Sequence, residues 1–145
     1  MKKLIGQLTD DLMDILGPQA SIEAIFRRYL RYSQSHSMRV SLMVATFGAR
    51  YVAGARMPAF ELLQSRITEE AGIKGRECED LALAIASLGF GTAQGMVAAG
   101  VDSKHAAQFQ RTAIQALRML LAAFSRGTKS KTPTSGARSK KSRSR

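Results

Sequence analysis

Residues 81–101 read LALAIASLGFGTAQGMVAAGV, and this uncharged stretch decides the fold. Its 21 residues are enough for a helix to cross a bilayer. The composition argues against that reading, because Ser87, Thr92 and Gln94 are polar, much of the remainder is Ala and Gly, and no Trp or Tyr flanks the stretch as an interfacial belt. We therefore expect this stretch to form a helix that is buried on all sides inside a soluble protein. A small membrane-associated protein is the less favoured alternative.

Amphipathic segments surround this stretch, which is typical of a soluble helical bundle. Apolar residues recur at helical spacing over 2–16, 21–34, 37–47, 58 to 72 or 75, and 103–125. The chain has only 3 prolines and no tryptophan, while residues that lose little freedom in a helix are abundant. The sequence predicts an all-α fold, a bundle of about five to six helices.

Glycine, proline and a capping aspartate mark the expected helix ends. Gly17 precedes a proline and is predicted to end the first helix, and Gly127 is predicted to end the last. Pro58 suits the first position of the fourth helix, and Asp102 is a good N-cap for the last. Residues 48–55 contain two glycines and are predicted to form a loop.

The positive charge is concentrated at the C-terminal end of the chain. The formal net charge is +11, but residues 127–145 contain seven basic residues and no acidic one, which leaves 15 basic against 11 acidic residues in 1–126. We expect one helical domain over 1–126, because 145 residues are too few for two cores, and a disordered basic tail over 127–145.

The tail is a candidate nucleic-acid-binding segment. Scattered cations without aromatic residues can release counterions from phosphates but cannot read bases, so only weak, nonspecific binding to DNA or RNA is expected. The candidate residues are Lys129, Lys131, Arg138, Lys140, Lys141, Arg143 and Arg145.

Enzymatic and metal chemistry have little support in the sequence. No nucleophile motif, phosphate loop or metal-ligand spacing is present, so we expect no catalytic residues, no metal and no cofactor. Cys78 is the single cysteine and is interpreted as inert, and His36 is interpreted as a turn residue rather than a ligand or pH sensor. No secretory signal is supported at the N-terminus, so a cytoplasmic location is expected.

A set of aromatic and methionine side chains is spread over several predicted helices. Such a set either fills a core or lines a cavity for a small apolar ligand, and the sequence alone favours the core for any one residue. The candidate ligand-binding residues are Phe26, Tyr29, Met43, Phe47, Phe60 and Phe90.

A symmetric homodimer is expected, because the helix at 79–99 is apolar or small on every face and needs a second surface to cover it. Small residues at i, i+4, i+7 and i+11 form a narrow stripe on this helix that allows close approach. The candidate interface residues are Ala82, Ala86, Gly89 and Ala93, with Ala113, Leu117 and Leu120 on the closing helix.

The order of these elements resembles a known family. Residues 22–48, IEAIFRRYLRYSQSHSMRVSLMVATFG, are similar to the segment of tetracycline-repressor-type (TetR) regulators in which one helix ends at a short turn and the next begins with an apolar run. Residues 79–124 resemble that family's final helix pair, a long apolar helix followed by an amphipathic closing helix. The resemblance covers about residues 4–125 by pattern rather than by an invariant motif.

The resemblance implies a ligand-binding and dimerisation domain of a transcriptional regulator. In that family the last two helices form a four-helix bundle with a partner subunit, and the earlier helices enclose a ligand pocket. The helix-turn-helix head that precedes such a domain is missing here, which implies either a truncated chain or a relative without its head. The alternative is a nucleic-acid accessory protein whose core dimerises while the tail binds phosphates.

Overall fold

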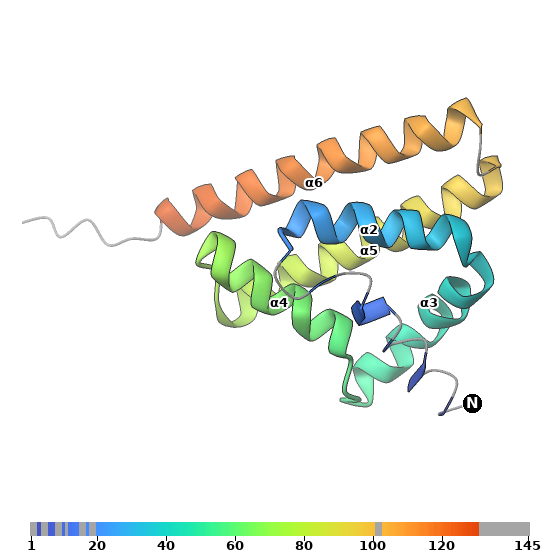
Figure 1. The fold of residues 1–145 in the computed structure, drawn as a ribbon. Coiled ribbons are helices and arrows are strands. Elements are labelled where there is room, and N and C mark those ends of the chain that lie inside the picture. Colours follow the sequence, from blue (N-terminus) through green and yellow to red (C-terminus); the bar gives the residue numbers. More distant parts are fainter. Residues whose placement is uncertain are drawn as a thin grey trace, which may run out of the picture.

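The described part of the chain is all helical. The computed structural model describes residues 3, 6, 7, 10, 12–14, 17, 20–100 and 103–130, with the side chains of 126–130 left out. Five complete helices lie in these ranges: α2 (Ile22–Ser35), α3 (Ser37–Val52), α4 (Pro58–Ala71), α5 (Gly75–Ala99) and α6 (Lys104–Ser130) (Figure 1). No strand occurs within the same ranges, so the predicted all-α class is confirmed. The first predicted helix, 2–16, falls largely outside the described residues.

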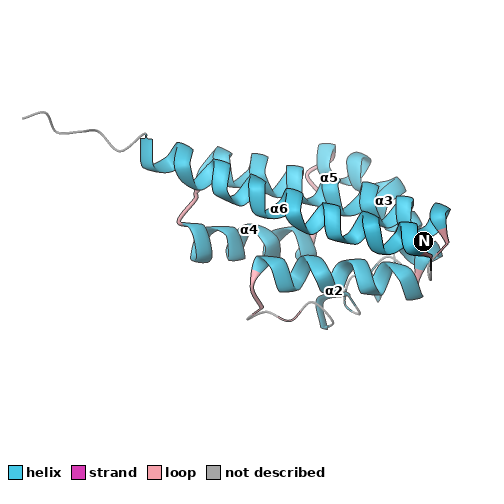
Figure 2. Cartoon of the chain, turned by 90° about the horizontal axis from the view of Figure 1, so that it is seen from above, coloured by secondary structure: helices cyan, strands magenta, loops and turns pink. Residues whose placement is uncertain are grey.

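Helix α5 lies at the centre of the bundle. It contacts α2, α3, α4 and α6, and α6 runs back along much of its length (Figures 1 and 2). Leu81 and Ala82 on α5 are fully buried, which places the decisive stretch in the core. The prediction of burial on every side is wrong, because Ser87, Gly91 and Gln94 are exposed.

The length and composition of α5 would also suit a membrane span. Its most apolar 18-residue window has a mean hydropathy of 1.5, and 39% of that window is buried within the bundle. A core helix passes the same test, and α5 is packed against four neighbours. The length and apolar composition of α5 are therefore only weak evidence for a membrane protein.

Helix boundaries follow the expected signals at some ends and not at others. Gly17 adopts a φ of +72°, which favours glycine, and Pro58 begins α4 as predicted. The predicted loop over 48–55 is wrong in its first half, because α3 continues to Val52. One glycine costs a helix interior only about 1 kcal/mol, and contacts of the Tyr51 ring with its neighbours offset that cost.

The last helix begins and ends differently from the prediction. Asp102, the predicted N-cap, lies outside the described residues, and the Ser103 hydroxyl accepts a hydrogen bond from the Ala106 N–H at 3.1 Å. Helix α6 continues past Gly127, the predicted end, to Ser130.

Two side chains of α4 hold the N-terminus of α2. The Ile22 N–H donates to Glu70 Oε1 at 2.8 Å, and Arg66 Nε donates to the Ala20 carbonyl at 2.8 Å. Arg66 and Glu70 also form an ion pair at 3.4 Å. A carboxylate at this position satisfies one of the free N–H groups of α2 and stabilises the positive end of its dipole. The clamp fixes α2 against α4, two of the helices that line the cavity described below.

We expect Glu70→Ala to lower the free energy of unfolding by about 1–2 kcal/mol, because the Ile22 N–H loses its charged acceptor. Urea denaturation followed by circular dichroism measures this. The matched control is Glu69→Ala, which removes an exposed partner of Arg66 and should change stability by about 0.5 kcal/mol or less. Equal losses in the two variants would contradict the clamp.

Candidate functional site

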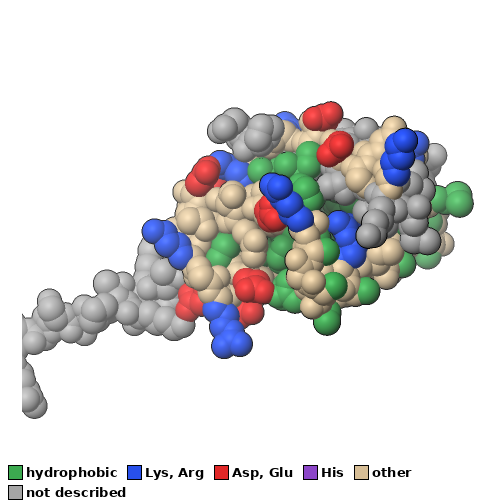
Figure 3. Space-filling view, turned by 90° about the horizontal axis from the view of Figure 1, so that it is seen from below, with side chains coloured by type: hydrophobic (Ala, Val, Ile, Leu, Met, Phe, Trp, Pro, Cys, Tyr) green, Lys and Arg blue, Asp and Glu red, His purple; other side chains and the backbone are tan. Residues whose placement is uncertain are grey.

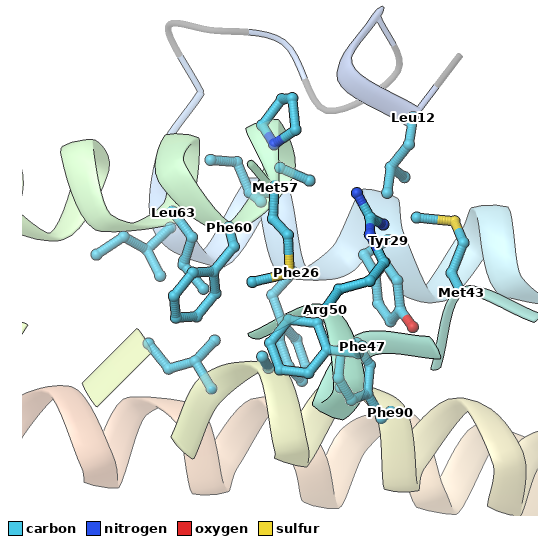
Figure 4. Close-up of a pocket in the computed structure, with 17 residues that line it drawn as sticks. Leu12, Phe26, Tyr29, Met43, Phe47, Arg50, Met57, Phe60, Leu63 and Phe90 are labelled. Atoms are coloured by element: carbon cyan, nitrogen blue, oxygen red, sulfur yellow. The ribbon is translucent and has the colours of Figure 1, made fainter. Parts of the chain in front are cut away.

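An apolar cavity of about 120 Å³ lies between α2, α3, α4 and α5 (Figure 4). Seventeen described residues line it. All six side chains proposed from the sequence as ligand-binding residues are among them: Phe26, Tyr29, Met43, Phe47, Phe60 and Phe90. Four helices thus bring together residues that are up to 64 positions apart in the sequence.

Aromatic rings form one wall of the cavity. The ring centroid of Phe47 lies 5.6 Å from that of Phe60 and 5.1 Å from that of Phe90, both in edge-to-face geometry. Tyr29 lies 6.2 Å from Phe90. Because edge-to-face pairs favour one relative orientation, these contacts hold Phe47 in place between α4 and α5.

Other residues that line the cavity were not among the six predicted from the sequence. Ile22 and Ile25 share the apolar face of α2 with Phe26, so their helical spacing was the available signal. Arg50 carries no such signal, because its position depends on the unpredicted last turn of α3. The Arg50 Nη2 donates to the Arg56 carbonyl at 3.0 Å and so holds the turn before α4.

The hydroxyl of Tyr29 is buried, and it has no hydrogen-bond partner among the described residues. Burial raises the pKa of Tyr29 to about 12, and the nearby Ser33 hydroxyl opposes that rise in part. Ser33 itself donates to the Tyr29 carbonyl at 2.8 Å. Tyr29 is therefore a neutral phenol at physiological pH.

The residues proposed for a dimer interface are mostly buried within one chain. Ala82, Ala93, Ala113 and Leu117 belong to the core, and Leu120 packs partly buried against it. The remaining two, Ala86 and Gly89, line the cavity. A methyl group at Gly89 would lie 3.3 Å from Cε1 of Tyr29, so the small residue serves contact with α2. Five of the seven predicted interface residues are buried within one chain and so cannot meet a partner, which corrects that part of the prediction, while Ala86 and Leu120 are partly exposed.

The remaining candidates lie away from the cavity. Cys78 is buried, and its Sγ lies 3.3 Å from the Gln64 carbonyl. His36 joins α2 to α3 and stacks on Tyr32 at 4.4 Å, in keeping with a turn residue. The Tyr51 hydroxyl donates to the Glu79 carboxylate, which raises the pKa of Tyr51.

The candidate nucleic-acid-binding residues of the tail fall on the part of the chain whose side chains are not described. Lys129 lies on α6 with its side chain undescribed, and the other six tail residues lie outside the described ranges. On the face shown in Figure 3, acidic and basic side chains are interspersed, with hydrophobic side chains visible between them.

No protein-family model, no curated protein and no solved structure matches this chain. The candidate site therefore has to be interpreted from its own geometry.

Proposed function

We propose that this chain is a regulatory domain that binds one small apolar molecule in the cavity between α2, α3, α4 and α5. The observation that carries the proposal is the convergence of aromatic and methionine side chains from four helices on a single apolar space. Ligand sites in proteins are concave, mostly apolar and furnished with a few polar groups, and this cavity has those properties.

The cavity volume limits the size of the ligand. At about 120 Å³ it is smaller than most drug-sized pockets. An engineered apolar cavity of about 150 Å³ in another protein binds benzene, so a single aromatic ring is the expected size class here. A flat ring also suits the edge-to-face contacts that Phe47 and Phe90 already make.

The proposed biological role is that of a TetR-like effector-binding domain. The resemblance in the order of helices supports it, and so does the packing of the two longest helices, α5 and α6, against each other at the end of the chain. In that role the domain would sense a ligand, and a helix-turn-helix would recognise the operator.

A ligand screen tests the proposal. Toluene and benzene are expected to raise the thermal midpoint of unfolding of the full chain, since a ligand at about 100 times its Kd adds about 2.7 kcal/mol to the stability of the native state. Ala86→Leu, which fills part of the cavity, should abolish the shift. A panel of one-ring and two-ring compounds that shifts neither protein would refute the proposed function.

The proposed dimer uses the exposed side of the closing helix pair. We define the neutral face by eight exposed, uncharged residues of α5 and α6: Ser87, Gly91, Gln94, Val97, Phe109, Thr112, Met119 and Ala123. Phe109 ties the two helices together, because a methyl group at Gly95 would lie only 2.9 Å from its Cε1. Exposed apolar side chains without charges are typical of the centre of a subunit interface.

We expect Met119→Glu to convert a homodimer into a monomer without unfolding it. Met119 is 67% exposed in the single chain, so the new carboxylate is tolerated in the monomer but would be buried unpaired in the dimer. The control is Met38→Glu on α3, where the side chain is 87% exposed, and it should remain dimeric. Light scattering after size exclusion at micromolar concentration measures both. A monomeric wild type, or dimers in all three proteins, would contradict this interface.

A further inference from the structure

One charged side chain is built into the otherwise apolar wall of the cavity. Among the described lining residues, Arg50 alone is ionised, and it is only partly exposed. Figure 4 shows its side chain extending from α3 toward Leu12. A guanidinium cannot lose its charge at physiological pH, so the cation is a permanent feature of the cavity.

The guanidinium is left with unused donors. It carries five N–H groups, and within the described ranges its one hydrogen bond is that of Nη2 to the Arg56 carbonyl. No carboxylate of the described residues pairs with it. Glu61 pairs with Arg56 at 3.6 Å, and Glu79 accepts from Tyr51. Partly buried charges are normally paired, because the loss of hydration is otherwise uncompensated.

From this arrangement we infer that the ligand is a small one-ring carboxylic acid, bound as its anion, whose carboxylate pairs with Arg50 while the ring occupies the aromatic part of the cavity. The inference rests on the proposed function and adds the chemical class of the ligand. A carboxylate matches the planar donor geometry of arginine and can accept two parallel hydrogen bonds. The cavity volume leaves room for the ring but little more, so the carboxylate lies at the Arg50 side.

Toluene and benzoate form a matched pair of probes, because both carry the same ring and differ in a methyl group or a carboxylate. Isothermal titration of the full chain is expected to give a Kd for benzoate at least about tenfold lower than for toluene, as a charged hydrogen bond in a partly desolvated site provides. Arg50→Met should remove this preference, so that benzoate binds no more tightly than toluene.

Two further variants separate recognition from a structural role of Arg50. Arg31→Met removes an exposed arginine of α2 outside the cavity and should keep the preference for benzoate. Arg50→Lys keeps the charge without the planar pair of donors, so it should retain part of the preference, and it replaces Arg50→Met if that protein does not fold.

The outcomes distinguish this inference from the proposed function. Toluene binding as tight as benzoate binding would overturn the assignment of an acid and leave an apolar ligand site standing. A benzoate preference that survives in Arg50→Met would overturn the role of Arg50. If neither probe binds the wild type, the cavity is not a ligand site, and both proposals fail.

Discussion

Leu117→Ala is expected to lower the free energy of unfolding by about 2–5 kcal/mol, the range for removing a fully buried leucine side chain. Leu117 has 0% exposure within the single chain and lies in the core between α6 and α5. The loss comprises the transfer energy of the deleted carbons and the cavity that they leave. Chemical denaturation at several protein concentrations measures it and separates folding from association.

The control is Met119→Ala, two residues further along the same helix. Met119 is largely exposed in the monomer, so at concentrations that favour the monomer this change should cost about 0.5 kcal/mol or less. Equal losses in the free energy of unfolding for the two variants would contradict the burial of Leu117 in the core. So would a loss for Leu117→Ala that arises only from weaker association of subunits.

Phe47→Ala is expected to enlarge the cavity and to change which ligands it takes. The substitution should cost about 2–4 kcal/mol, because Phe47 is partly buried and its ring contacts those of Phe60, Phe90 and Tyr51. The space of the lost ring then admits a second ring of a ligand. Naphthalene, too large for the wild type, should raise the thermal midpoint of the variant.

Phe124→Ala is the matched control, because Phe124 packs on the core without lining the cavity. It should lose stability without gaining naphthalene binding. Phe47→Leu supplies a milder enlargement if the alanine variant does not fold. Naphthalene stabilising the wild type and the variants equally would show that it binds outside this cavity.

Much of the fold could be predicted from local patterns. The spacing of apolar residues in 21–34 and 103–125 reflects one-sided burial, and that pattern survives without knowledge of the partners. Pro58 marked the start of α4, and Gly17 adopts a positive φ, because the backbone preferences of these residues are intrinsic. Helix ends that depend on tertiary contacts could not be predicted in this way. The extension of α3 to Val52 relies on Tyr51, whose ring contacts Phe60.

The sequence identified candidate residues for a cavity, but it could not show that they lie around one common space. Large side chains such as Phe26 and Phe90 are expected inside any bundle, and only the packing of four helices shows that they border one space. The stripe of small residues on α5 predicted a close contact with another helix, but it did not indicate which helix that is. That neighbour is the chain itself, since Gly89 faces Tyr29 and Phe26.

The methionines of this chain provide the most direct test of the cavity as a ligand site. Met43 and Met57 line the cavity, while Met38 on α3 and Met119 on α6 are exposed and do not line it. In a carbon-13 methyl NMR titration with toluene, the signals of Met43 and Met57 are predicted to shift and saturate together, and those of Met38 and Met119 to stay in place. Unchanged Met43 and Met57 signals at saturating toluene, or shifts confined to Met38 and Met119, would contradict ligand binding in this cavity.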